Sequence, residues 1–249
     1  MTTARRFHST MQETIGTKRT LQAGRITMRY HGLMAALLIV GLLSGFVGHQ
    51  STCPERREIL LFNGKDLSGW DYYLADPNAK MEDVWSVDKE QGILICKGAP
   101  PGYLYTKKDY TNFILKLEWR WAPGKQPGNS GVLLRVHGEH KIWPRSIEAQ
   151  LMYMNSGDFW LIDGAPLETT PEYVDKNASR HRWRKKTAEK PAPEWNEYEI
   201  IVNGDRVTLK VNGEVVNEGW GAEVRPGKIA LQSEGGEIHF RNIRLTPLE

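Results

Sequence analysis

Residues 129–137 and 145–153 are two neighbouring segments of the sequence in which apolar and polar side chains alternate. Side chains of a β-strand point alternately to its two faces, so the apolar residues of each segment form one face and the polar residues the other. The apolar sets are Val132, Leu134 and Val136 in the first segment and Ile147, Ala149 and Leu151 in the second. Two such strands side by side would gather the following polar side chains on one surface: Asn129, Arg135, His137, Glu148 and Gln150.

These residue types fit proton transfer on a sugar. Glu148 and His137 are proton-transfer groups, and Arg135 is able to stabilise a developing oxyanion. Gln150 and Asn129 each offer a donor and an acceptor, which suits sugar hydroxyls. The alternative is a solvated outer face with paired charges, since exposed charges are common on strands.

Further candidates lie before and after the two segments. Glu118 and Arg120 would extend the surface on the preceding strand, whereas Asp158 and Trp160 would face the same groove from the following one. Trp160 would then stack on a sugar ring, unless it is a core residue. Two more candidates would flank the groove: Tyr103 in a Gly/Pro-rich stretch and His181 in the basic run 180–186. The alternatives are packing within a hairpin for Tyr103 and a solvated loop for His181.

Strands must position these side chains, because alternation with a period of two continues from residue 59 to the end of the chain. The clearest strand runs from 113 to 121, and tight turns at 203–205 and 212–213 join the later strands. No helical periodicity exceeds two turns. The pattern predicts an all-β sandwich or jelly roll with a long polar loop at about 175–195.

The N-terminal residues 1–53 differ in character from the rest. Residues 33–48 carry no charge and follow Arg25 and Arg29, which is typical of a secretory signal. The apolar core is short for a spanning helix. We therefore expect one domain at 54–249 that is exported to the periplasm or the exterior. An uncleaved or lipidated N-terminus, with Cys53 as the lipidated residue, is the alternative and the only expected membrane contact.

Charge and cysteine content exclude several classes of protein. The formal charge is +3, but residues 54–249 hold 27 Lys and Arg against 29 Asp and Glu. The body is therefore not expected to bind nucleic acid. Only two cysteines occur, Cys53 and Cys96, which excludes a disulfide-stapled scaffold. Motifs of serine hydrolases, phosphate-binding loops and zincins are absent from the sequence.

Several motifs occur together and in a familiar order. They are the run at 61–70, Asn129-Ser130-Gly131, Glu148-Ala149-Gln150, Trp195-Asn196, and the closing segment 231–245. This order resembles the 3-keto-disaccharide hydrolase family, a concanavalin-like jelly roll, over about residues 59–248. The resemblance places Glu148, Gln150, Arg135 and Asn129 at signature positions. One departure is Tyr153, where many relatives carry an acid; it marks either different substrates or binding without cleavage.

The resemblance implies cleavage of glycosides already oxidised at C3. A ketone at C3 acidifies the C2 hydrogen, so a base removes it, the C1 oxygen leaves and water adds back. The expected base is Glu148 or His137, with Arg135 stabilising the enolate and with Gln150 and Asn129 orienting the sugar.

Three questions stay open at this level. The chain is either this enzyme or a non-catalytic, lectin-like carbohydrate-binding module. An ordinary endo-glycosidase is disfavoured, because two acids close together on one strand are missing. The spacing of residues does not decide whether a cofactor is used, but a divalent ion would polarise the ketone, with ligands offered by Glu148, Asp158, His137 and Gln150.

Overall fold

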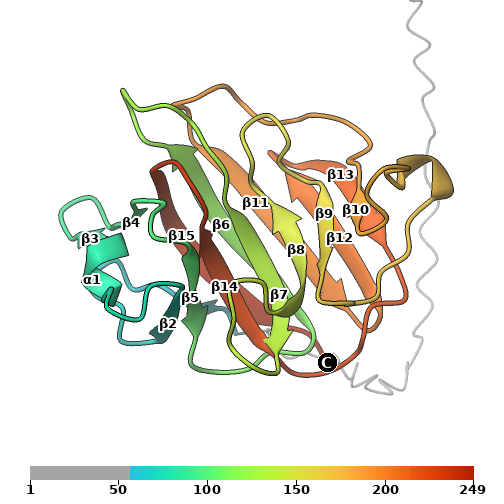
Figure 1. Ribbon diagram of the computed structural model, residues 1–249, viewed down its shortest axis with the longest axis horizontal. Coiled ribbons are helices and arrows are strands. Elements are labelled where there is room, and N and C mark those ends of the chain that lie inside the picture. Colours follow the sequence, from blue (N-terminus) through green and yellow to red (C-terminus); the bar gives the residue numbers. More distant parts are fainter. Residues whose placement is uncertain (1–56) are drawn as a thin grey trace, which may run out of the picture. The chain divides into compact units, whose positions relative to one another are not determined.

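The computed structural model describes residues 57–249, which fold into two antiparallel β-sheets packed face to face (Figure 1). The eight-stranded sheet runs, in spatial order, through β13 (Glu214–Gly219), β12 (Arg206–Val211), β11 (Asn196–Asn203), β6 (Phe113–Trp121), β15 (Ile238–Pro247), β4 (Ile93–Cys96) and β3 (Trp85–Asp88), with β1 (Ile59–Leu60) also paired to β15. The seven-stranded sheet runs through β10 (His181–Arg182), β9 (Phe159–Ile162), β8 (Arg145–Gln150), β7 (Gly131–His137), β14 (Lys228–Ser233), β5 (Gly102–Thr106) and β2 (Trp70–Leu74). The described residues also form two short helices, α1 (Met81–Val84) and the 3-10 helix η1 (Pro171–Tyr173).

The predicted all-β sandwich is confirmed, and the alternation of side chains explains why. Along β6 every second residue from Phe113 to Trp121 is buried. Its apolar face meets the apolar face of the other sheet in one core, to which Phe159 of β9 and Val132 of β7 also belong. Burying such side chains is the main favourable term in folding, at roughly 1.5 to 3 kcal/mol for each large residue.

A β-bulge in β7 changes the faces predicted for the second half of this strand. The pairing between β7 and β8 shifts between Leu134 and His137, and Arg135 adopts a left-handed backbone with φ of 52°. An extra residue in one strand reverses the alternation beyond it. Val136 therefore packs with Leu133 and Tyr103 on the side away from the main core, instead of with Val132.

Arg135 itself, predicted to face the open surface, has a structural role instead. It is 5% exposed, and its guanidinium donates hydrogen bonds to the carbonyl groups of Thr111, Gly204 and Glu223 and to the side chain of Asn112. These acceptors lie in connections that flank strands of the eight-stranded sheet. The bulge thus turns Arg135 into a clamp between loops, and the prediction that it stabilises an enolate is wrong.

Glu118 and Arg120 are also misplaced by the sequence prediction, because β6 lies between β11 and β15 in the eight-stranded sheet and does not neighbour β7. Their side chains point to the outer face of that sheet. Glu118 accepts hydrogen bonds from Arg241 and Asn242, and the guanidinium of Arg120 lies 4.6 Å from the centre of the Trp195 ring. Strands that follow each other in the sequence need not be neighbours in a sheet.

The predicted signal segment at 33–48 and Cys53 lie outside the described residues. Within residues 57–249, no helix is long and apolar enough to cross a bilayer.

Replacing Arg135 with Met tests the clamp. The change leaves several buried carbonyl oxygens without their donor, and each costs about 1 to 3 kcal/mol. We expect the free energy of unfolding to fall by about 3 kcal/mol in urea denaturation. Arg206→Met is the matched control, because Arg206 is exposed on β12, and we expect it to change stability by less than about 0.5 kcal/mol. Equal stability of the two variants would contradict the clamp.

Candidate active site

The face of the seven-stranded sheet that points away from the core carries several polar side chains that are buried. The pairing of the strands arranges the residues of this face in rows that run across the sheet. The first row crosses four neighbouring strands and consists of Leu133 of β7, Glu148 of β8, Trp160 of β9 and His181 of β10, each paired with the next across the strands. In the adjacent row Gly131 of β7 lies opposite Gln150.

A pocket of about 170 Å³ lies over these rows. Its floor is polar and its walls are mostly apolar, with the exposed Trp143 and Met152 at the entrance. The lining residues are Asn129, Trp143, Glu148, Gln150, Met152, Trp160, Ile162, Arg180 and Glu234. A concave site with aromatic walls and a few convergent polar groups is the usual form of a small-molecule site.

Glu148 lies at the floor of this pocket. Its side chain is on the open face but only 4% exposed, and its Oε1 has no hydrogen-bond partner. Burial raises the pKa of Glu148 well above its ordinary value, and the negative charge of Glu234 raises it further, whereas Arg180 and Gln232 oppose the shift. Desolvation disfavours the charged carboxylate, so burial favours the protonated form of Glu148.

Gly131 provides the space that Glu148 needs. A Cβ atom at position 131 would lie 2.5 Å from Glu148 Oε1 and 2.3 Å from Oε1 of Gln232 on the neighbouring strand β14. Both side chains therefore lie above bare backbone. The motif Asn129-Ser130-Gly131 owes its glycine to this close approach.

Glu234 is a site residue that the sequence analysis missed. It follows β14 in a turn with Gly235 and Gly236, and this turn packs tightly on the backbone of Gly128, where an added Cβ would lie 2.0 Å from the Gly235 carbonyl oxygen. Burial raises the pKa of Glu234 to about 7, against the opposing effect of the nearby Asn129 amide. The signal available in the sequence was an acid beside a Gly-Gly turn at the end of a central strand.

Five buried polar atoms in this region have no hydrogen-bond partner. They are Oε1 of Glu148, Oε2 of Glu234, Oδ1 of Asn129, and Oε1 and Nε2 of Gln232. Buried polar atoms are almost always paired, so a cluster of unpaired ones marks a place where a ligand is expected. Gln150 differs, because its Oε1 accepts from the backbone N–H groups of Leu151 and Met152. This fixes the side-chain amide and leaves its Nε2 as the free donor.

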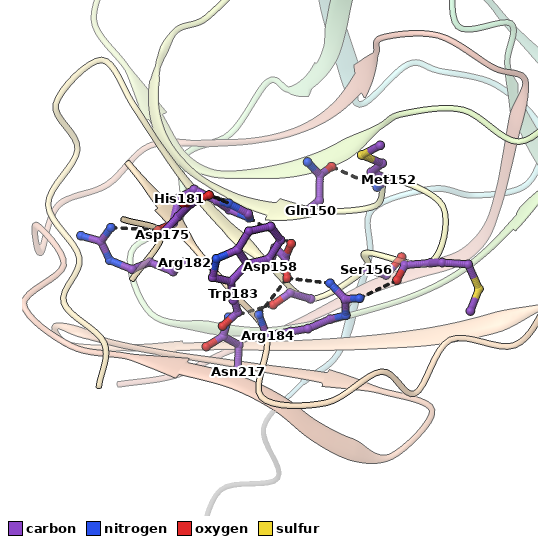
Figure 2. A network of polar contacts seen from close by, with 12 residues as sticks. Gln150, Met152, Ser156, Asp158, Asp175, His181, Arg182, Trp183, Arg184 and Asn217 are labelled. Atoms are coloured by element: carbon purple, nitrogen blue, oxygen red, sulfur yellow. Dashed lines mark hydrogen bonds and ion pairs between the residues drawn. The ribbon is translucent and has the colours of Figure 1, made fainter. Parts of the chain in front are cut away.

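A second polar cluster lies beside the pocket, around His181 (Figure 2). Nε2 of His181 is 3.0 Å from Oδ2 of Asp158, and Nδ1 is 3.1 Å from Oδ2 of Asp175. Burial lowers the pKa of His181, but the hydrogen bonds to Asp158 and Asp175 outweigh it and raise the pKa overall. A carboxylate on each ring nitrogen favours the form of the imidazole that carries both protons and a positive charge.

This cluster supports the aromatic wall of the pocket. The His181 ring stacks on Trp160 with the ring centres 4.3 Å apart, and Trp183 contacts the same imidazole edge-on at 4.0 Å. The other oxygen of Asp158 accepts hydrogen bonds from the backbone and the guanidinium of Arg184. Trp160 therefore lines the pocket as predicted, whereas Asp158 and His181 are buried supports that hold the segment after β10 against it.

Two other predicted residues lie away from the pocket. His137 is beyond the bulge, where Nδ1 is 2.7 Å from the Arg135 carbonyl oxygen and Nε2 is 3.6 Å from Glu223. Tyr103 is on the same face of the sheet but fully buried, with its hydroxyl 2.8 Å from Nδ1 of His140 and its ring stacked on Tyr73. Of the predicted residues, the pocket brings together Asn129, Glu148, Gln150 and Trp160.

The four side chains considered as metal ligands do not converge. His137 is beyond the bulge, and Asp158 is occupied by His181 and Arg184. Among residues 57–249, no three His, Cys, Asp or Glu side chains form a cluster suited to a metal ion.

Replacing Glu234 with Gln tests the desolvation of the pocket through protein stability. The folded state raises the pKa of Glu234 from 4.5 to about 7, so ionisation costs stability as pH rises through this range. We expect the variant to unfold at the same urea concentration as the parent near pH 4. Near pH 8.5 we expect it to be more stable by about 1 to 2 kcal/mol, after allowing for partial exposure. A constant difference across this range would contradict the desolvated site.

Comparison with known proteins agrees with the fold. Two glycosyl hydrolase-like proteins of Parabacteroides distasonis ATCC 8503 superpose with TM-scores of 0.56 and 0.54 at 22% and 24% identity; each alignment covers 77% of this chain, and 94% and 100% of theirs. A β-glucanase of Bacillus licheniformis superposes with a TM-score of 0.53 at 11% identity, covering 76% of this chain and 97% of the glucanase. These likenesses establish the concanavalin-like fold. A search of curated proteins gives no match.

The family comparison is more specific. Residues 57–246 match the model of the 3-keto-alpha-glucoside-1,2-lyase-like domain. This confirms the resemblance found in the motif order, and it spans nearly all of the described residues. The chain belongs to the 3-keto-alpha-glucoside-1,2-lyase-like domain family.

Proposed function

We propose that this protein cleaves glycosides that carry a ketone at C3, by removal of the C2 proton, elimination of the C1 oxygen and addition of water. The observation that carries the proposal is Glu148, a desolvated carboxyl group with an unpaired oxygen at the floor of a pocket with amides and tryptophans. A carboxyl group with a raised pKa is suited to proton transfer near neutral pH. Membership of the family supports the same reaction.

The other pocket residues suit an oxidised sugar ring. Trp160 offers an aromatic surface for the ring, and its stacking on His181 fixes its orientation. The free Nε2 of Gln150 and the unpaired amide of Gln232 are neutral donors for the C3 oxygen, on which negative charge develops when C2 loses its proton. These amides take the part that the sequence analysis gave to Arg135. Asn129 at the rim is available to a sugar hydroxyl.

The same observations disfavour a purely binding module. Burying carboxyl groups without partners lowers stability, and a lectin gains nothing from them because sugar hydroxyls are bound as well by amides. An ordinary glycosidase would also use two carboxyl groups. Substrates with and without the ketone distinguish the proposed elimination from the hydrolysis that an ordinary glycosidase catalyses.

We further propose that the protein acts outside the cytoplasm. The support is the uncharged segment 33–48 after Arg25 and Arg29, which resembles a secretory signal.

The test of the proposed function is incubation of the purified protein with 3-keto-trehalose and, in parallel, with trehalose. We expect release of glucose and 3-keto-glucose from the first and no reaction with the second. Glu148→Gln should lower kcat by about a hundred-fold or more, because the proton-transfer group is lost. Glu118→Gln, on the outer face of the other sheet, should leave kcat unchanged. Intact 3-keto-trehalose at high protein concentration would sink the proposal for this substrate, and equal cleavage of trehalose would indicate an ordinary glycosidase.

Gly131→Ala tests the close approach of the sheet backbone to the pocket. The new methyl group would displace the side chains of Glu148, including its Cγ, and of Gln232 rather than backbone. We therefore expect kcat/KM for 3-keto-trehalose to fall by about ten-fold or more, with a loss of about 1 to 3 kcal/mol in the free energy of unfolding in a protein that still folds. Gly69→Ala is the control, because Gly69 is exposed and an added Cβ there would meet nothing closer than the Leu61 carbonyl oxygen at 3.8 Å; Gly69 does not line the pocket. Unchanged kcat/KM in Gly131→Ala would contradict the assigned geometry.

A further inference from the structure

We propose that Glu234 is the second proton-transfer group of this site, and that it removes the C2 proton while Glu148 protonates the leaving C1 oxygen. The inference rests on the proposed function and assigns to two named carboxyl groups the steps that this function requires.

The geometry brings the two groups to one pocket from different parts of the chain. Glu148 stands in the middle of β8, and Glu234 follows the end of β14. Between these strands lies β7, whose bare Gly131 is approached by Glu148 from β8 and by Gln232, two residues before Glu234, from β14. Each carboxyl group has one buried oxygen without a hydrogen-bond partner, and both line the same cavity.

The glycine turn fixes Glu234 in this position. The backbone N–H of Asn129 donates to the Gly235 carbonyl oxygen at 2.7 Å. Gly235 and Gly236 have φ of 112° and 87°, and a Cβ on Gly236 would lie 2.7 Å from the backbone of Gly128. Only glycine adopts this path without strain at such a close contact. The turn therefore holds Glu234 at the same rim of the pocket as Asn129.

Burial divides the roles between the two carboxyl groups. Glu148 is more deeply buried than Glu234, and the negative charge of Glu234 raises the pKa of Glu148 further. Two neighbouring carboxyl groups in a desolvated site share one proton, which stays on the group that loses more solvation when charged. In the resting site Glu148 is the carboxylic acid and Glu234 is the carboxylate.

The reaction then balances without any further reactant except water. The Glu234 carboxylate takes the C2 proton, and the electron pair of the C2–H bond forms an enolate whose charge lies on the C3 oxygen. The enolate then collapses, so that a C1–C2 double bond forms and the bond between C1 and the leaving oxygen breaks. That oxygen takes the electron pair of the broken bond and the proton of Glu148. The two carboxyl groups together therefore still hold one proton, which is now on Glu234. Water next adds to C1: Glu148 takes a proton from the water, and Glu234 returns its proton to C2. Both groups end as they began.

The experiment separates the two proton transfers. Methyl and p-nitrophenyl 3-keto-glucosides are incubated in deuterated water with the full-length protein, and two rates are measured, corrected for the uncatalysed reaction: deuterium incorporation at C2 and release of the alcohol. Glu148→Gln and Glu234→Gln are compared with Glu237→Gln. Glu237 lies in the same connection between β14 and β15 as Glu234, but its carboxylate is paired with Lys125 and His239. Glu234→Asp retains a carboxylate at a shorter reach. Thermal unfolding shows whether each variant is folded.

The inference predicts different defects in the two variants. Glu234→Gln should lose deuterium incorporation and the release of both alcohols by about a hundred-fold or more, with partial recovery in Glu234→Asp. Glu148→Gln should retain deuterium incorporation within about ten-fold and lose methanol release, but it should still release p-nitrophenol, because nitrophenolate leaves without a proton. Glu237→Gln should match the parent.

Two results would overturn the inference while leaving the proposed function intact. The first is a parent protein that cleaves both glucosides and a folded Glu234→Gln that still exchanges deuterium at the parent rate. The second is the reverse division, with exchange lost in Glu148→Gln and retained in Glu234→Gln. A parent that neither exchanges deuterium nor releases an alcohol would overturn the proposed function and this inference together.

Discussion

The burial of the Glu148 carboxyl group on the open face of a β-sheet is the constraint on which the rest of the site depends. A side chain on such a face is normally solvated, and a carboxyl group is among the last to lose its water. Here the strand geometry supplies the dry environment. Gly131 lets the carboxyl group lie against the backbone, Trp160 shields it on one side, and Glu234 with Gln232 encloses the other. The result is a carboxyl group at the floor of the pocket whose protonated form is favoured by burial.

The wall that shields Glu148 depends in turn on charge. Trp160 lies near the edge of the seven-stranded sheet, where only the two-residue strand β10 follows β9. An edge this short has few backbone hydrogen bonds, so side chains must hold the chain in place. His181 does so through its two carboxylates, and Arg184 adds a further ion pair to Asp158. Truncating one member of such a buried group costs more than a surface ion pair, because its partners keep an unpaired charge. This explains why the basic run at 180–186 contains a buried histidine rather than only solvated charges.

The sequence was most informative where one physical rule acts along one strand. The alternation in 113–121 and 131–137 predicted strands that match β6 and β7. The same rule placed Glu148 and Gln150 on one face of β8 and Ile147 and Ala149 on the other. The rule failed at Arg135, because a bulge adds a residue to the strand there. Arginine is not a residue type that indicates a left-handed backbone, so the sequence carried no signal for the bulge.

Long-range pairing was the second source of error. Glu118 lies close to β7 in sequence but belongs to the other sheet, whereas Glu234 lies a hundred residues beyond Asn129 and shares its pocket. Pairing of β7 with β14 creates that neighbourhood, and no local pattern encodes it. The family motifs recovered part of this information, because they mark Asn129, Gly131 and the closing segment together.

The most direct test of the proposed site is a crystal structure of the protein soaked with 1,5-anhydro-3-keto-glucitol, a ring that has the ketone but no leaving group at C1. We expect the ring to lie against Trp160, with C2 facing the carboxyl groups of Glu148 and Glu234 and the C3 oxygen accepting a hydrogen bond from Gln150 or Gln232. A ring bound elsewhere on the molecule, or one in the pocket with C2 directed to solvent and away from both carboxyl groups, would contradict it.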